Sequence, residues 1–450
     1  MKAISTRDQA VATRNACRMC APLGAAWAFR GIEGAVPFLH GSQGCATYIR
    51  RYMISHFREP LDVASSSFTE EAAVFGGAKI LRAGLENVAK QYQPSLIGVA
   101  STCLSETIGE DLAGMVRLLK RDEQFPPLVY VSTPSYSGSH ATGFHAAVAA
   151  LAEQLANNER RGDWLNIFPG MVSPADLRYL KELLKASGVN AILVPDYSET
   201  LDGASWSEYQ RVPPGGTPVD HLRRLGGAQA SIQFGGSTQI ETSAATFLQN
   251  RFGVPAIRLE WPVGISATKR FLKALRKCGG HTPIEPHNGE WGRLVDAYVD
   301  GHKYLFDRRV ALFGDSDLVV GLAGFLAEVG LRLVLCATGE KGTNLKSRLA
   351  AVAPEQTSSM RCLEGVDFED IREEVKQCEP EILMGSSKGY KLARPLKLPL
   401  LRVGFPIHDR FGGQRIQHLG YRGAQQLLDR LINTVIEREQ AKSTVGYSYY

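Results

Sequence analysis

Short apolar runs alternate with longer amphipathic stretches along most of the chain. A run of four to six apolar residues is typical of a strand buried on both faces, and an amphipathic stretch between two such runs is typical of a crossover helix. The candidate strands are Leu96–Ala100, Leu128–Ser132, Ala191–Pro195, Ala230–Phe234, Val310–Phe313, Leu331–Cys336, Ile382–Gly385 and Leu400–Gly404. This pattern predicts an α/β protein with parallel sheets.

Small residues follow almost every predicted strand, as in Ser101-Thr102-Cys103 and Gly404-Phe405-Pro406. Ligands of open α/β sheets bind at the carboxyl ends of the strands, so we expect these loops to form the functional edge of the sheets.

Two helices are predicted in some detail. One begins at Ser173-Pro174, a capping residue followed by proline at the first helical position, and ends at Gly188; the other covers Ala141–Asn157.

The length of 450 residues predicts two to three domains. A polar run over Asn157–Asp163 and a Gly/Pro-rich run over Lys277–Asn288 interrupt the α/β pattern. We therefore predict three α/β domains of Rossmann-like architecture, at residues 1–160, 161–305 and 306–450.

Composition narrows the classes of function. The chain is 44% hydrophobic and 22% charged, and its net charge of +5 is too small to indicate binding to nucleic acid or to an anionic membrane. Neither an apolar stretch long enough to span a bilayer nor an apolar segment in Met1–Ala10 is present, so we expect a cytoplasmic protein. Because the sequence has neither a P-loop nor a dinucleotide fingerprint, we expect no ATP hydrolysis by this chain itself.

Four of the eight cysteines fall in the first quarter of the chain: Cys17, Cys20, Cys45 and Cys103. The last three stand at turns beside glycine, proline or other small residues. Such loops allow thiolates to converge on an iron–sulfur cluster while backbone amides approach the sulfur atoms. Plain burial as free cysteines is the alternative. Cys17 and Cys20 form a C-x-x-C that suits a redox pair or half a zinc site, but no second pair completes a zinc set.

Long ordered motifs surround these cysteines. They are His40-Gly-Ser-Gln-Gly-Cys45, His56-Phe-Arg-Glu-Pro60, Thr69-Glu-Glu-Ala-Ala-Val-Phe-Gly-Gly77, Ser101–Asp111, Thr133–Gly143, Gly404–Arg410 and Gly420–Gly423. Together they resemble the β-type subunit of nitrogenase component 1, the molybdenum–iron protein family. The resemblance is dense over the first 145 residues and looser beyond them.

The resemblance implies three α/β domains and half of the ligands of an [8Fe-7S] P-cluster at an interface with an α-type subunit. Cys20, Cys45 and Cys103 match the three β-side cysteine ligands. Ser139 matches the serine that can ligate iron in the oxidised cluster, and a turn serine with local backbone bonds is the alternative. Phe75 matches the position where the ATP-dependent iron protein docks; the alternative is an aromatic residue of the core. Tyr48 lies on the electron-transfer route between this docking position and the cluster.

The resemblance further implies a subunit of an oxidoreductase without catalytic residues of its own. We expect an α2β2 heterotetramer that receives electrons from a homodimeric iron protein, with a large catalytic iron–sulfur cluster on the α subunit. Dinitrogen or a sulfur compound, as in the methylthio-alkane reductases, would be reduced there. His40 is interpreted as a structural histidine rather than a ligand, and Arg58 with Glu59 as surface or interface charges.

Three features depart from the family. The first matched cysteine comes close to the start, so we expect no long N-terminal extension, and Cys17 is an additional thiol. The segment Phe411-Gly412-Gly413-Gln414-Arg415 resembles the β-like subunit of the cofactor-assembly scaffold. A non-catalytic scaffold subunit therefore remains the alternative to an electron-relaying subunit, which the complete set of three cysteines and Ser139 favours.

Overall fold

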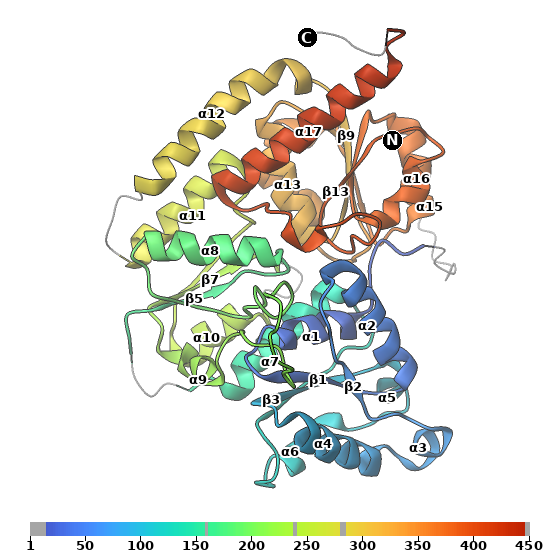
Figure 1. Ribbon diagram of the computed structural model, residues 1–450, viewed down its shortest axis with the longest axis vertical. Helices are drawn as coiled ribbons and strands as arrows, with labels where there is room; N and C mark the ends of the chain where they lie inside the picture. Colours follow the sequence, from blue (N-terminus) through green and yellow to red (C-terminus); the bar gives the residue numbers. More distant parts are fainter. Residues whose placement is uncertain (1–14, 158–160, 237–240, 280–284, 446–450) are drawn as a thin grey trace.

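The computed structural model describes residues 15–157, 161–236, 241–279 and 285–445, and it contains three β-sheets flanked by helices (Figure 1). Each pairing between named strands in these ranges is parallel. The predicted α/β class with parallel sheets is therefore confirmed.

The first sheet has the strand order β2-β1-β3-β4. Strand β3 alternates its side chains between two apolar layers: Ile97 and Val99 pack with helices α4 and α6, whereas Leu96 and Ala100 face the core that contains α1 and α7. The elements of this region are α1 (Ala21–Arg30), β1 (Ala35–His40), α2 (Gln43–Phe57), β2 (Ala64–Ser65), α3 (Glu70–Phe75), α4 (Ala78–Tyr92), β3 (Leu96–Ser101), α5 (Cys103–Thr107), α6 (Leu112–Leu119), β4 (Leu128–Val131) and α7 (His140–Leu155).

The second sheet has the order β6-β5-β7-β8. Its helix α8 begins as the sequence predicts, because the Ser173 side chain accepts a hydrogen bond from the Asp176 amide and the Asp176 carboxylate accepts one from the Ser173 amide. The elements are β5 (Leu165–Phe168), α8 (Pro174–Ala186), β6 (Ala191–Leu193), α9 (Val219–Arg223), η1 (Arg224–Gly227), β7 (Ala230–Phe234), α10 (Ala244–Phe252), β8 (Ala256–Leu259), α11 (Gly264–Gly279) and α12 (Glu285–Leu305).

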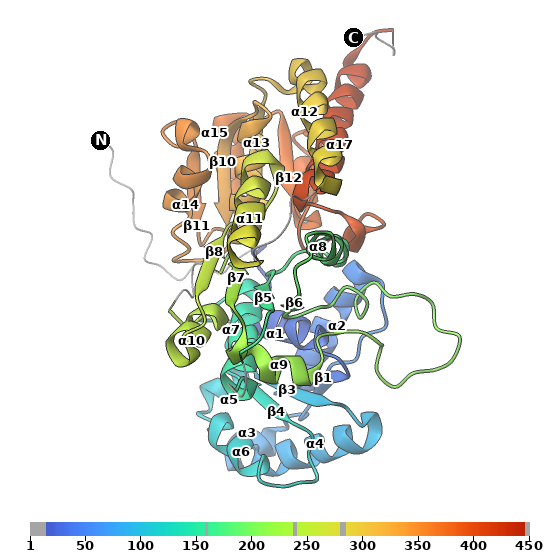
Figure 2. The same ribbon diagram turned by 90° about the vertical axis from the view of Figure 1, so that its left-hand side faces the viewer.

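The third sheet has the order β11-β10-β9-β12-β13. Its last helix, α17, packs along α12 and α11, and both views show α12 and α17 side by side (Figure 2). The elements are β9 (Arg309–Gly314), α13 (Ser316–Glu328), β10 (Arg332–Thr338), α14 (Leu345–Val352), η3 (Pro354–Gln356), β11 (Arg361–Glu364), α15 (Phe368–Cys378), β12 (Ile382–Gly385), η4 (Ser387–Gly389), α16 (Tyr390–Ala393), β13 (Leu400–Arg402), η5 (Gly413–Arg415) and α17 (Gly420–Lys442).

An aromatic cluster around Trp27 joins the three regions. Trp27, on α1, lies 4.9 Å from Phe57, 5.5 Å from Tyr197 and 5.1 Å from Phe405 between ring centroids. These three rings come from the sequence ranges of the first, second and third sheets respectively. The helix that begins beside Cys20 is therefore held where all three regions meet.

The strands of each sheet fall within one of the predicted ranges 1–160, 161–305 and 306–450. Near the start, however, Ala16 pairs with Asp367 and the Phe368 amide donates to the Asn15 carbonyl, so this segment packs on the third region. Residue 160, the first boundary, lies outside the described residues, and the division into domains remains a proposal. Each helix in the described ranges is too short or too polar to cross a bilayer.

Candidate metal centre

Three cysteines lie at the beginnings of helices on the carboxyl edge of the first sheet. Cys45 lies in the first turn of α2, which follows β1, and Cys103 is the first residue of α5, which follows β3. These strands are parallel neighbours, and His40 at the end of β1 pairs with Ser101 at the end of β3. Cys20 is the N-cap of α1. The topology therefore brings together thiols that are widely spaced in the sequence.

The electrostatics of Cys20 reflect this proximity. Burial, together with the neighbouring thiols of Cys45 and Cys103, raises the pKa of its thiol to about 11. Such a cysteine stays protonated without a compensating cation. Bound metal supplies that charge and deprotonates its thiol ligands, so the donor set suits a metal group.

Two serines direct donors at the sulfur atoms. The Ser135 amide donates to Cys103 Sγ at 3.2 Å, and the Ser42 hydroxyl donates to Cys45 Sγ at 3.7 Å. Ser135 also accepts a hydrogen bond from the Ala21 amide at 3.2 Å through its side chain, which ties the loop after β4 to the start of α1. Donors of this kind stabilise thiolate ligands of iron–sulfur clusters. Sequence reasoning assigned no role to Ser42 or Ser135, because only the fold brings them to the sulfurs.

The size of the site argues against a single ion. Over the described ranges, no three His, Cys, Asp or Glu side chains come together closely enough to hold one metal ion. Cys103 is exposed, and Cys20 and Cys45 are half-buried. Separated, partly open thiols fit a larger group in which each iron takes its own thiolate, and we find no support for zinc.

Cys17 packs against the third region. It is 8% exposed and belongs to an apolar cluster beneath the third sheet that includes Phe313 and Phe368. Burial raises the pKa of its thiol to about 12. All eight cysteines are free, so the C-x-x-C with Cys20 forms no disulfide. A redox pair or half a zinc site at Cys17 and Cys20 is not supported by this arrangement.

Ser139 is buried at the N-cap of α7. Its hydroxyl accepts hydrogen bonds from the amides of Ala141 and Thr142 and donates one to Glu340 Oε1 at 2.5 Å. The local bonds are those expected of a capping serine, and ligation of iron would require it to lose its proton and leave Glu340. Its role as a ligand stays a prediction. Glu340 comes from the loop after β10, and no local pattern in the sequence identifies it.

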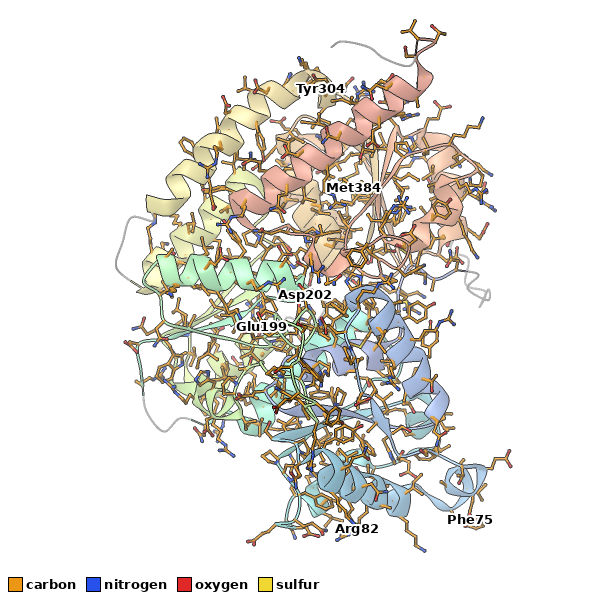
Figure 3. The ribbon with its side chains drawn as sticks, viewed as in Figure 1. Phe75, Arg82, Glu199, Asp202, Tyr304 and Met384 are labelled. Atoms are coloured by element: carbon orange, nitrogen blue, oxygen red, sulfur yellow. The ribbon has the colours of Figure 1, made fainter. Side chains whose placement is uncertain are left out.

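Tyr48 and Phe75 both reach the surface. Tyr48 is 45% exposed on α2, and its ring centroid lies 4.6 Å from that of Tyr52 with the rings tilted by 52°. The pKa of Tyr48 is raised by burial, by Tyr52 and by the charge of Cys20. Phe75 is 83% exposed at the end of α3, at the outer edge of the molecule (Figure 3). The alternative of a core aromatic at Phe75 is therefore wrong. The docking role of Phe75 and the route through Tyr48 remain predictions.

A hydrogen-bond chain connects the loop after Phe75 to Gly41, just before α2, the helix that carries Cys45. The Gly77 amide donates to Glu110 Oε1 at 2.6 Å, and Glu110 Oε2 lies 3.5 Å from His40 Nε2. His40 Nδ1 lies 3.1 Å from the Ser66 hydroxyl, which accepts from the Gly41 amide at 3.0 Å. Burial lowers the pKa of His40. Its interpretation as a structural histidine is confirmed.

The motif around α2 contains three further titratable residues, His56, Arg58 and Glu59. His56 is buried, accepts a hydrogen bond from the Ile407 amide at 2.9 Å, and its pKa is lowered to about 3 by burial, so it is neutral. Arg58 is exposed and ends α2 in a left-handed conformation with φ of 63°. Glu59 is half-buried, and burial followed by the charge of Asp202 raises its pKa.

Comparisons with known proteins agree with this site and fold. Residues 20–436 match the model of the family described as nitrogenase component 1 type oxidoreductase. The chain is 35% identical to the nitrogenase molybdenum-iron protein beta chain of Clostridium pasteurianum over 96% of its length and 94% of that protein. Identity to the beta chain of Azotobacter vinelandii is 32%, over 95% of this chain and 84% of that one. The structure titled "Nitrogenase Cp1 at pH 6.5" superposes with a TM-score of 0.93 at 31% identity, covering 100% of this chain and 98% of that chain.

The fold and the cysteine site thus define a class of α/β oxidoreductase subunit, and the chain belongs to the nitrogenase component 1 family. Within this family it is of the β type, as the similarity to several molybdenum-iron protein beta chains shows. A chain of another solved structure, titled "Nitrogenase Cp1 at pH 5", superposes with a TM-score of 0.71 at 15% identity, so it shares the fold.

Proposed function

We propose that the chain binds half of a P-cluster-type [8Fe-7S] cluster through Cys20, Cys45 and Cys103. The observation that carries the proposal is the placement of all three thiols at helix beginnings on one sheet edge, with donors from Ser42 and Ser135 on two of the sulfurs. Positive helix ends and aimed donors stabilise thiolate ligands. Such a cluster, when bound, stores and passes electrons.

We propose further that the open side of the site is covered by an α-type subunit. Large apolar side chains border the thiols: Tyr48 is 45% exposed, Leu104 is 38% exposed and Tyr136 is 65% exposed. Tyr136 follows the Ser135 that binds Cys103. Three thiols hold only part of a large cluster, and clustered exposed apolar side chains mark an interaction surface. An α2β2 assembly in which the partner supplies the remaining ligands would satisfy both features.

In this assembly the chain relays electrons. An ATP-dependent iron protein docks on the face that carries Phe75, and the cluster passes electrons to a metallocluster in the α subunit. Dinitrogen or a sulfur compound such as a methylthio-alkane is reduced at that metallocluster, and no catalytic residue is assigned to this chain. The intact set of three cysteines supports a relay over an assembly scaffold.

The proposal is tested with Cys→Ala variants at positions 20, 45 and 103 in the chain co-expressed with its α-type partner. Each variant should lose iron per αβ pair and lose the paramagnetic signals of the oxidised cluster. Cys336→Ala is the matched control, because Cys336 is a fully buried cysteine of β10 outside the site. Normal iron and spectra in Cys45→Ala would refute the cluster. Loss of iron in Cys45→Ala alone would favour the scaffold function.

A further inference from the structure

A cavity of about 400 Å³ lies in the third region, between β13, the loop after it and α17. Its polar lining consists of Arg402, Arg410, Arg415, Gln417, Gln426 and Arg430. No aspartate or glutamate of the described chain lines it. Gln426 and Arg430 are four residues apart on α17 and share one helix face, while Arg402 is the last residue of β13. The lining thus combines four guanidinium groups at the carboxyl end of a strand, where α/β sheets bind ligands.

Arg430 is the least compensated of these cations. It is half-buried, its Nη2 donates to the Arg402 carbonyl at 3.1 Å, and its Nη1 is buried without a hydrogen-bond partner in the described residues. Nor does the described part of the chain provide a carboxylate that forms an ion pair with Arg430. A buried charge without a counter-ion is costly, so the folded chain gains from an anion beside it.

The neighbouring donors are also incompletely satisfied. Arg402 is 9% exposed; its Nη2 donates to Asp409 at 2.7 Å and its Nη1 to the Leu400 carbonyl, but its Nε finds no partner among the described groups. Gln417 is 8% exposed, and its Nε2 is likewise without a partner there.

Two further arginines stand at the mouth of the cavity. Arg410 is 58% exposed with Asp409 3.8 Å away, and Arg415 is 54% exposed with Asp202 at 3.0 Å. Within the described residues, the carboxylates that form ion pairs with these four guanidinium groups are Asp409 and Asp202, and neither lines the cavity. Asp202 is also shared with Arg178.

We propose that this cavity is a binding site for a small free oxyanion that carries a phosphate or carboxylate group. Planar guanidinium forks bind both kinds of oxyanion through paired charge-assisted hydrogen bonds. The anion joins Arg402 of β13 to Arg430 of α17 and neutralises the positive charge between them. This site is separate from the cysteine edge and does not depend on the proposed cluster.

The test is a calorimetric titration of the full chain, alone and co-expressed with its α-type partner, with inorganic phosphate in one arm and succinate in the other. Sodium chloride at matched ionic strength serves as the reference. We expect saturable binding of one anion per chain and a rise in melting temperature above that in sodium chloride. The anion that binds more tightly, phosphate or succinate, shows whether the site prefers a phosphate or a carboxylate group. Binding of neither anion, or equal effects of all three salts, would overturn the proposal.

Arg430→Gln should weaken binding by about tenfold or more, because it removes a charged donor. Without phosphate this variant should melt no lower than the wild type, since it also removes an uncompensated cation. Arg438→Gln on the same helix is the matched control: Arg438 is half-buried but donates to the Glu381 carbonyl outside the cavity, so binding should persist. If Arg430→Gln does not fold, the exposed Arg410→Gln should weaken binding severalfold. Unchanged affinity in both Arg430→Gln and Arg410→Gln would refute the site.

Discussion

The hydroxyl group of Ser139 donates a hydrogen bond to Glu340 across 201 residues of sequence. Glu340 Oε2 also accepts the Ser316 amide at 3.0 Å, at the beginning of α13. One carboxylate therefore holds the starts of α7 and α13 together, and both Ser139 and Glu340 are buried. The residue proposed to ligate the oxidised cluster is thus also part of the contact between the first and third regions.

Ser139→Ala should lower the free energy of unfolding by about 2–3 kcal/mol, because it removes a helix cap and takes the hydroxyl donor away from the buried Oε1 of Glu340. Ser243→Ala, at the buried N-cap of α10, is the matched control for a cap whose hydroxyl forms no hydrogen bond to a carboxylate within the described residues, and it should cost about 1 kcal/mol. Denaturant unfolding of both variants measures the difference. Equal losses would mean that the bond to Glu340 contributes nothing to stability.

In the cluster-loaded assembly the same Ser139→Ala variant should keep its full iron content while its oxidised spectra change. The reason is that an alkoxide is a hard ligand that suits more oxidised iron, whereas thiolates hold the reduced cluster. Iron analysis and paramagnetic spectra after oxidation check this outcome. Identical oxidised spectra would remove Ser139 from the proposed ligands.

Asp315 should make stability depend on pH. It is the buried N-cap of α13, and burial followed by the charges of Glu340 and Asp317 raises its pKa to about 7. The unfolded carboxyl titrates near pH 4, so the folded state alone keeps the proton between about pH 4 and pH 7. The favourable contribution of the protonated Asp315 is present at low pH and is lost as pH rises through about 7.

Asp315→Asn keeps a capping side chain at this position, but asparagine cannot ionise. The free energy of unfolding of the variant, relative to that of the wild type, should therefore rise by about 1–3 kcal/mol between pH 5 and pH 8. Thermal unfolding at both pH values measures this change. Asp111→Asn, at the exposed N-cap of α6, is the control for replacing a capping aspartate by asparagine. A pH-independent effect of Asp315→Asn would contradict the assignment.

Glu110 should order the loop that follows Phe75. Its side chain is 5% exposed and accepts the Gly77 amide at 2.6 Å. Glu110→Gln removes the charge from this bond and from the contact with His40, so exchange of the Gly77 amide hydrogen should accelerate by about tenfold. Hydrogen exchange with mass spectrometry measures it. Glu86→Gln, which breaks a surface pair with Arg82, should leave this exchange unchanged.

Phe75→Asp should weaken coupling to the iron protein while cluster content and stability stay normal, since a docking surface depends on a few exposed aromatic anchors. ATP-dependent reduction of the assembly is the measurement. Phe411→Asp is a matched control, because both phenylalanines are 83% exposed and Phe411 lies in the third region. Equal loss in both variants, or no loss in either, would remove Phe75 from the docking surface.

Much of the fold was predictable because buried parallel strands are continuous apolar runs. The observed β7 and β12 have the predicted bounds, and β3 extends one residue beyond its prediction. Strand β1 was not predicted because Pro37 stands in a strand with neighbours on both sides, where proline is unusual. Strand β8 was also not predicted; three of its residues are only partly buried and Arg258 is exposed.

The candidate site was predictable only as far as its residues lie in recognisable motifs. Cys20, Cys45 and Cys103 could be named from the sequence, but their approach depends on the adjacency of β1 and β3. The partners that control these groups could not be named. Glu340 reaches Ser139 only because the first and third regions pack together.

Cys17 should be dispensable for the cluster. Its side chain packs with Phe313 and Phe368 beneath the third sheet, and burial keeps its thiol protonated. Cys17→Ala should therefore cost about 1 kcal/mol of stability through lost packing while iron per αβ pair stays at the wild-type value. Cys17→Ser should cost more, because the buried hydroxyl gains no apolar contact and needs a hydrogen-bond partner. Cys336→Ala gives the cost of truncating a buried cysteine of β10 outside the site. A selective loss of iron in Cys17→Ala relative to this control would make Cys17 a fourth ligand.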